Sequence, residues 1–332
     1  MTFNPSSELQ VCFVAVLVSL FSVTLRAQTS SEIADSFSSA VPSLSSCGQS
    51  PDACSPTSAT VAHPGDSNQN DAAGSDSRHE GDWVRSWMGR VAKARASQPH
   101  FVSPLVTTHV MLVQQYRFDI SRQGDPTGAT VTSNYGASRG LEIVPVTRLE
   151  VGIFPPSYLA HQSRVPDGFG DLSWQVKFRA FSATEGRGDY FVGLFLGGSL
   201  PTGSPPNGLG HSSLSPAFAA AKGIGPCDVQ TTIGANLPAS GTNVLGRMIV
   251  FNTAVDYKIK GKIWPMIEQN STFWSGGTLD GKKEVFLTPG IVLGSFPLAE
   301  QVHLSIGGGV QIAATTFHQY NHRWILSARF PF

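Results

Sequence analysis

Residues 171–179, with the sequence DLSWQVKFR, alternate strictly between polar and apolar side chains. A period of two indicates a β-strand with one polar and one apolar face. Its nine residues exceed the five or six of a typical strand in a soluble sheet. The apolar set is Leu172, Trp174, Val176 and Phe178.

The same alternation recurs along the chain from residue 104 to its C-terminus. Turn-rich segments divide this region into twelve predicted strands, and an even number is typical of bacterial outer-membrane barrels. The strands are expected near residues 104–119, 134–146, 147–155, 170–182, 189–200, 213–222, 228–237, 246–258, 263–274, 284–294, 301–313 and 322–332.

A soluble β-sandwich also alternates, so the choice between sandwich and barrel rests on other features. Most of the predicted strands have about 9–13 residues, which suits a tilted crossing of a bilayer. Aromatic residues also gather near strand ends, as in the girdles of membrane barrels. The sequence therefore predicts an all-β fold, a transmembrane antiparallel up-and-down β-barrel. The aromatic residues are Tyr116, Phe118, Trp174, Phe178, Phe181, Tyr190, Trp264, Phe273, Trp274, Trp324, Phe330 and Phe332.

The predicted connections alternate in length, which supports the barrel. Longer ones would form outer loops and shorter ones periplasmic turns, with both barrel termini on the periplasmic side. The chain ends on Phe332, a hallmark of strands that the barrel-assembly machinery recognises. The longer connections are residues 120–133, 156–169, 201–212, 238–245, 275–283 and 314–321.

The region before residue 104 has a different character. Residues 11–23 form an apolar run too short to span a membrane as a helix, which favours a cleaved signal peptide over residues 1–27. The first ten residues lack Lys and Arg, and a buried helix is the alternative. Residues 28–81 are rich in Ser, Pro, Asp and Gly and are expected to be disordered. Residues 82–103 predict a short amphipathic helix and lead-in, lying on the membrane, in the barrel mouth or against the rest of the protein.

Charge and cysteine content restrict the function classes. The net charge is zero and charged residues make up 14%, so nucleic acid is not expected as a partner. Export would permit a disulfide between Cys47 and Cys54. Cys227 has no cysteine near it in the sequence and is expected to be unpaired.

No enzyme, metal or cofactor site is predicted. His211, Ser212 and Ser213 lie in a flexible loop without a fixed acid partner, so a catalytic triad is not indicated. Residues 307–309 (GGG) lie inside an alternating strand, where they would permit bending or a close backbone approach.

Charged residues on the polar faces are the candidate site. They would point into the lumen, either lining an aqueous channel that they make selective or pairing across it and closing it. A twelve-stranded barrel lies between filled eight-stranded barrels and open porins, so both interpretations stand. The candidates are Arg117, Asp119, Arg148, Glu150, Asp171, Lys177, Arg179, Asp256 and Glu268.

Three short motifs resemble one known family. Residues 168–179 (GFGDLSWQVKFR), 197–204 (GGSLPTGS) and 286–290 (FLTPG) are similar to motifs of the phenol-degradation meta-pathway (MetA) outer-membrane family of β-barrel transporters. The resemblance covers residues 104–332 and implies an outer-membrane pore or transporter for small organic molecules, including hydrophobic ones. It brings no catalytic residues.

Two functions remain from the sequence. The first is an outer-membrane channel or transporter for a small-molecule solute. The alternative is a non-conducting structural or interaction barrel whose N-terminal arm binds envelope partners. In both, the expected partners are outer-membrane lipid and the barrel-assembly machinery.

Overall fold

A computed structural model describes residues 76–332, with side chains from residue 83 onward. The predicted signal peptide, most of the predicted disordered linker and the Cys47–Cys54 pair lie outside these residues. The helices are α2 (Asp76–Ala96) and α3 (Thr242–Leu245), with short 3₁₀ turns η1 (Glu185–Arg187) and η2 (Gly277–Leu279). The strands are β1 (Gln115–Gly124), β2 (Val131–Gly136), β3 (Leu141–Val146), β4 (Leu149–Phe154), β5 (Tyr158–His161), β6 (Gly168–Phe169), β7 (Leu172–Ala183), β8 (Tyr190–Leu200), β9 (Ser213–Ile224), β10 (Cys227–Pro238), β11 (Arg247–Tyr257), β12 (Ile263–Ser275), β13 (Lys283–Pro297), β14 (His303–Ala313) and β15 (His322–Pro331).

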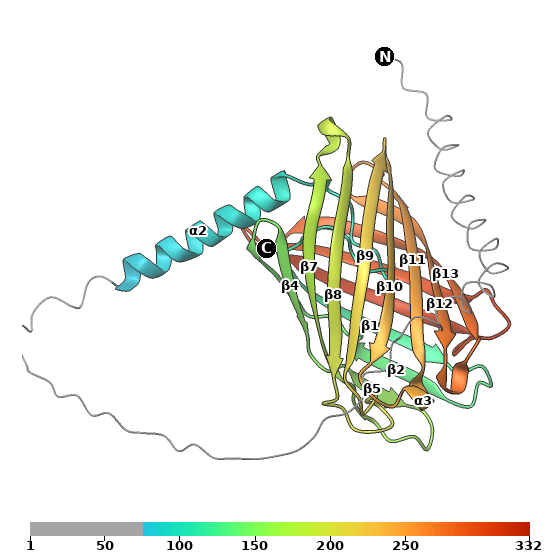
Figure 1. The fold of residues 1–332 in the computed structure, drawn as a ribbon. Coiled ribbons are helices and arrows are strands. Elements are labelled where there is room, and N and C mark those ends of the chain that lie inside the picture. The colour runs from blue at the N-terminus through green and yellow to red at the C-terminus, as the bar shows by residue number, and fades with distance from the viewer. Residues whose placement is uncertain (1–75) are drawn as a thin grey trace, which may run out of the picture. The chain divides into compact units, whose positions relative to one another are not determined.

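The strands form a closed antiparallel barrel (Figure 1). Sequential strands pair with one another, and β15 returns to pair with β1 from Gln115↔Pro331 to Gln123↔Arg323. Three pairs of segments, β2 with β3, β4 with β5, and β6 with β7, each occupy one strand position, interrupted by residues 137–140, 155–157 and 170–171. The barrel therefore has twelve strand positions, which confirms the predicted fold class and strand number.

The first predicted strand is wrong in its position. The wall begins at Gln115, and residues 104–114 are not part of it. Similarly, β5 and β6 lie within residues 156–169, which were expected to form a loop. An alternating pattern indicates an extended chain, but it does not say what that chain pairs with.

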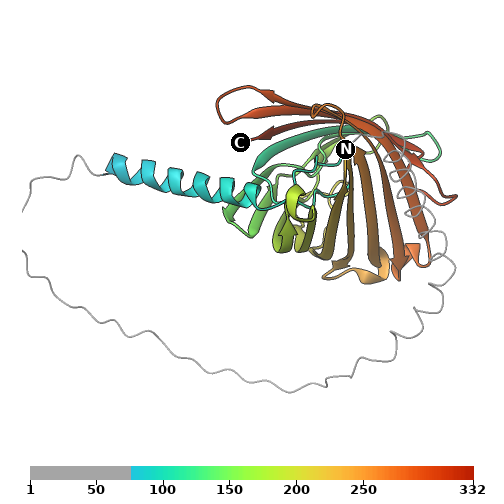
Figure 2. The same ribbon diagram turned by 90° about the horizontal axis from the view of Figure 1, so that it is seen from above.

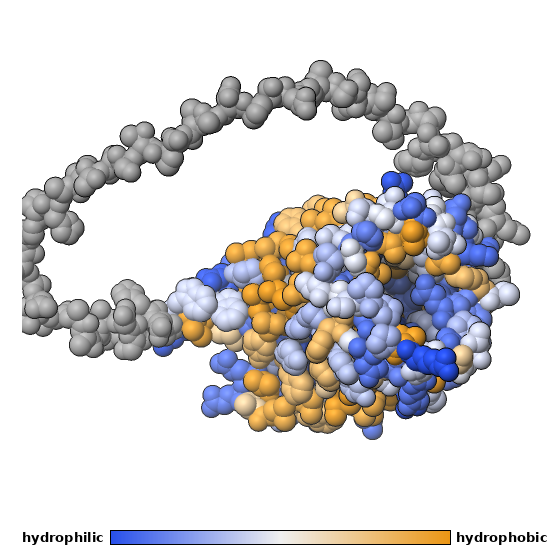
Figure 3. Space-filling model, turned by 90° about the horizontal axis from the view of Figure 1, so that it is seen from below, coloured by the Kyte–Doolittle hydropathy of each residue, from blue (hydrophilic) through white to orange (hydrophobic). Residues whose placement is uncertain are grey.

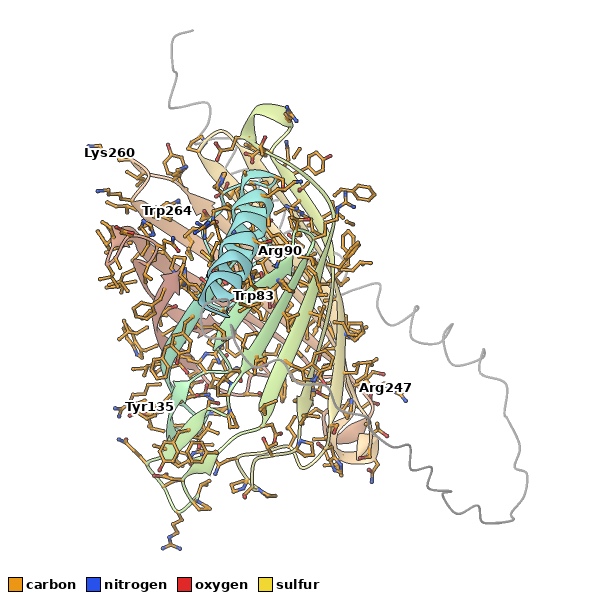
Figure 4. All side chains as sticks on the ribbon, turned by 90° about the vertical axis from the view of Figure 1, so that its left-hand side faces the viewer. Trp83, Arg90, Tyr135, Arg247, Lys260 and Trp264 are labelled. Atoms are coloured by element: carbon orange, nitrogen blue, oxygen red, sulfur yellow. The ribbon has the colours of Figure 1, made fainter. Side chains whose placement is uncertain are left out.

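The two ends of the barrel differ in their connections. At one end, the short-turn end, the strands join through residues 147–148, 184–189, 225–226, 258–262 and 298–302. At the other, the loop end, connections include the long loop 201–212 and α3 (Figure 1). Lys260 and Trp264 lie toward the short-turn end, whereas Tyr135 and Arg247 lie toward the loop end (Figure 4).

The outer and inner faces of the wall differ in polarity. Large apolar side chains such as Leu194, Trp324 and Leu326 are more than half exposed on the outside. Viewed from the loop end, hydrophobic residues gather along the outer surface and hydrophilic residues toward the centre (Figure 3). Trp264 and Trp274 depart from the girdle prediction, because their alternation places them on the inner face, where Trp274 is 6% exposed.

The part of α2 from Trp87 onward packs on the barrel. Trp87 Nε1 donates to the carbonyl of Val144 at 3.0 Å, and Val91 and Ala94 are buried in a cluster with residues of β8 and β9. Of the three predicted locations of this helix, these contacts show the one in which it packs against the rest of the protein. Among the residues described, no helix has the length and apolarity needed to cross a membrane.

The prediction for Cys227 is wrong, because this residue is disulfide-bonded. The other three cysteines of the chain lie outside the described residues. The long distance in sequence between Cys227 and any other cysteine did not exclude a disulfide, because folding brings remote positions together.

Candidate functional site in the barrel lumen

Residues 101–114, the plug segment, run through the inside of the barrel. Within this segment Leu105, Thr107 and Val110 are at most 1% exposed. The view onto the short-turn end shows the chain after α2 passing inside the curve of strands (Figure 2). Two groups of wall residues hold it, polar side chains that bind its backbone and small or apolar side chains that contact its side chains.

Glu268 on β12 binds three consecutive backbone amides of the plug segment. Its Oε1 accepts from the N–H of Leu105 at 2.6 Å, and its Oε2 accepts from Val106 at 3.1 Å and Thr107 at 2.6 Å. Glu268 is fully buried. Hydrogen bonds to an ionised carboxylate are among the strongest that a backbone amide makes. Glu268 therefore anchors the plug segment at one point of the wall.

Three arginines, the arginine cluster, bind the carbonyl oxygens of the same residues. Arg117 donates to Pro104 O at 2.9 Å and Leu105 O at 2.6 Å, and Arg139 donates to Val106 O at 2.9 Å. Arg329 donates to Pro104 O at 2.9 Å and also to the carbonyl of Ser103. Together with Glu268, the cluster satisfies the backbone of a bent, irregular segment that no neighbouring strand pairs.

Asp119 neutralises part of the arginine cluster. Its Oδ2 lies 2.6 Å from Arg117 Nη2 and 3.4 Å from Arg139 Nε. No ion pair between Arg329 and a carboxylate is found in the described part of the chain. Of the three guanidinium groups, only those of Arg117 and Arg139 pair directly with a carboxylate. The other hydrogen bonds of the cluster go to neutral carbonyls and, from Arg329, to the hydroxyl of Ser327.

The side chain of Leu105 fits against three glycines, Gly290, Gly307 and Gly309, which we name the glycine cradle. A Cβ at these positions would lie 2.4, 2.7 and 2.7 Å from Leu105 methyl carbons. Any larger residue there would collide with Leu105. A close backbone approach was predicted for residues 307–309, whereas the group that approaches Gly307 and Gly309 from the plug segment is a leucine side chain.

The rest of the plug segment packs on an apolar part of the inner wall. Phe101, Val110, Met111 and Leu112 are buried with inward residues of β8 and β9, among them Phe191, Phe195 and Ala219. Small residues on β9 leave room for the segment. The lumen here has a hydrophobic core, in contrast to the polar side that holds residues 103–107.

A second group of charges lies on β3, β4 and β7. Lys177 Nζ is 2.7 Å from Glu150 Oε1 and 3.2 Å from Glu142 Oε1, and Glu150 also accepts from Val113 N at 2.5 Å. Arg179 donates to the carbonyl of Ala94 at 2.9 Å near the end of α2, where a cation is favoured by the helix dipole.

The structure brings most of the predicted candidates together, but not all of them. Arg117, Asp119, Glu150, Lys177, Arg179, Asp256 and Glu268 are all buried, at no more than 6% exposure. Arg148 lies exposed in the two-residue turn between β3 and β4. Asp171 lies at the loop end, where its carboxylate accepts from Gly203 N and Leu209 N and anchors the loop 201–212.

Several lumen residues were missed by the sequence analysis. Arg329 and Glu142 follow the inward alternation of their strands, so the pattern could have identified them. Arg139 could not be found, because it lies in a bulge where Ala137 and Ser138 adopt positive φ values of 43° and 53°. His109 and Gln230, which donates to Val102 O at 2.7 Å, gain a role only once the plug segment is inside.

Residues with possible catalytic chemistry are engaged elsewhere. His211 Nδ1 lies 2.8 Å from Ser240 Oγ, and Ser213 Oγ pairs with Ser199 Oγ at 2.8 Å. His211 is therefore bonded to neither of its neighbouring serines. Within residues 76–332, no three His, Cys, Asp or Glu side chains are grouped to hold a metal ion.

The fold and lumen together define a closed twelve-stranded barrel with an apolar outside and an occupied polar interior. No family model matches the chain, so the MetA resemblance rests on the short motifs alone. No curated protein matches its sequence either.

Among solved structures, the chain is similar to an outer membrane channel from Pseudomonas putida F1, with 13% identity, a TM-score of 0.46 and coverage of 70% of this chain and 100% of that one. It is also similar to the translocator domain of the autotransporter NalP from Neisseria meningitidis, with 10% identity, a TM-score of 0.37 and coverage of 78% and 98%. Because these scores are low, the fold assignment rests on the strand pairing of this chain.

Proposed function

We propose that this protein is an outer-membrane channel or transporter for small organic solutes, closed by its own plug segment. The observation that carries the proposal is the contrast between the two faces of the wall. An apolar outer face suits lipid, whereas buried charges of both signs on the inner face suit an aqueous passage. The backbone of residues 103–107 of the plug segment is held by hydrogen bonds, which water can replace when the segment leaves.

Outer-membrane localisation after signal-peptide cleavage, contact with lipid, and assembly through the strand that ends at Phe332 belong to the same proposal. The exposed apolar belt supports lipid contact, and β15 supports the last point because it closes the barrel against β1. The MetA resemblance supports a small organic solute, including hydrophobic ones.

Conductance in planar bilayers tests the channel function. We expect wild-type protein to give small, infrequent openings, and Glu268→Gln to open far more often. Gln keeps one acceptor but loses the charge that binds three amides, which weakens the seat of the plug by about 1–3 kcal/mol. Glu284→Gln is the matched control, because Glu284 faces inward but accepts from Gln319 N in the loop 314–321.

The occupied lumen also favours the second candidate, a non-conducting barrel that presents its N-terminal region to envelope partners. Folded wild-type and Glu268→Gln proteins that both stay silent in the bilayer would overturn the channel and favour this candidate.

A further inference from the structure

A cavity of about 160 Å³ lies between the plug segment and the wall. Ser103 and His109 line it from the plug segment, and Arg117, Arg139 and Phe154 line it from the wall. An apolar protein cavity of roughly 150 Å³ holds a benzene molecule, so this one accommodates a compact solute of six to eight heavy atoms.

The plug side of the cavity presents polar atoms with spare hydrogen-bonding capacity. Ser103 Oγ has no partner among the described residues, and no side chain there bonds to either ring nitrogen of His109. The two residues are only 7% and 8% exposed. Buried polar side chains in folded proteins almost always have a partner. These atoms therefore leave hydrogen-bonding capacity that a polar guest in the cavity can use.

The wall side of the cavity favours an anionic guest. Arg117 and Arg139 share the single carboxylate of Asp119, and their other hydrogen bonds go to neutral carbonyls of the plug segment. Glu142 also lines the cavity, but Lys177 Nζ and the amide of Gln115 engage its carboxylate. Because a guanidinium binds a carboxylate more strongly than a carbonyl, an anion is the better partner for both arginines.

The remaining wall offers an apolar contact. Phe154 projects into the cavity, and Gly152 lies so close to its ring that a Cβ there would be 2.6 Å away. The missing side chain at Gly152 thus leaves room for the ring. The arginine side of the cavity therefore suits the charged group of a ligand, and Phe154 suits the apolar part of the same ligand.

We propose that this cavity binds a small organic carboxylate with an apolar body, its carboxylate on Arg117 and Arg139. The binding site stands on the cavity itself, whereas its place on a transport path rests on the proposed channel function. Since the same arginines hold Leu105 O and Val106 O, a bound carboxylate competes with the plug segment for them. Binding therefore loosens the plug and raises the open probability.

Titration calorimetry of the full-length protein folded in detergent tests binding, with pentanoate as the probe. We expect pentanoate to bind at least tenfold more tightly than pentan-1-ol, which lacks the charge, and than acetate, which lacks the apolar body. Equal affinity for pentanoate and either comparison solute, or no binding of pentanoate, overturns the proposal.

Two variants locate the site. Arg139→Gln is expected to weaken pentanoate binding at least tenfold, while Arg323→Gln, which alters an arginine bonded to Gln311 away from the cavity, leaves it unchanged. His109→Phe fills the cavity from the plug side and should abolish binding without removing a wall charge. Unchanged binding in both Arg139→Gln and His109→Phe, or equal losses in Arg139→Gln and Arg323→Gln, would refute the site.

Conductance recordings in planar bilayers test the channel function separately. Added pentanoate should raise the open probability of the wild-type protein but not that of Arg139→Gln. A silent bilayer combined with tight pentanoate binding overturns the channel and leaves the binding site standing. An open probability that pentanoate does not alter, in a conducting protein that binds it, refutes the competition with the plug.

Discussion

At the scale of single residues, the fit between Leu105 and the glycine cradle makes a testable pair. Leu105→Ala empties a buried site and should cost about 2–5 kcal/mol in unfolding free energy. Gly307→Ala places a Cβ 2.7 Å from Leu105 Cδ2 and should cost about 1–3 kcal/mol through overpacking. The double variant should lose about 1 kcal/mol less than the sum, because the smaller residue 105 relieves the clash.

Urea unfolding from lipid vesicles measures this cycle. Gly308→Ala is the matched control, since the middle glycine of the triplet alternates to the other face and a Cβ there would have only ordinary contacts at 3.6 Å. Additive losses in the double variant would mean that Leu105 does not occupy the cradle in the folded protein.

At the scale of one element, β8 carries an apolar outer side, and the proposed membrane location predicts that a charge placed there is destabilising. Leu194 lies near the middle of β8 and is 55% exposed. Leu194→Arg should lower the unfolding free energy in vesicles by about 2–4 kcal/mol, the cost of a cation near the bilayer midplane.

Leu209→Arg is the comparison, because Leu209 is 52% exposed but lies in the loop 201–212 at the barrel end. This substitution should change the unfolding free energy by no more than about 0.5 kcal/mol. Equal effects of the two substitutions would show that β8 does not face lipid.

At the scale of the whole molecule, closure of the barrel by β1 and β15 should give a compact species that resists unfolding in detergent until heated. Ser327 pairs with Asp119 on β1 and with Gly307 on β14. Ser327→Pro places a residue without an N–H in a central strand, so the fast-migrating band of the unheated protein should disappear.

Phe332→Ala should keep this band after refolding, because Phe332 follows the last ladder pair, Gln115↔Pro331. Gel mobility before and after heating is compared for the two variants. This comparison distinguishes the effect of barrel closure from the effect of the aromatic side chain at the C-terminus. A compact band that persists in Ser327→Pro would contradict closure through this seam.

The local pattern of the sequence determined the number of strand positions, twelve, and the facing of most wall residues, because a strand between an apolar outside and a polar interior must alternate at every step. Arg117, Lys177 and Glu268 were predicted inward on that ground and are buried. The pattern could not distinguish a wall strand from a segment that runs inside the barrel, so residues 104–114 were misplaced.

Only the tertiary structure decided what fills the lumen. Glu268 meets Leu105 across 163 positions of sequence, the bulge at residues 137–140 turns Arg139 inward, and the glycine cradle acquires meaning only from the leucine beside it. These are contacts between remote segments, and their geometry depends on barrel closure, which no local periodicity encodes.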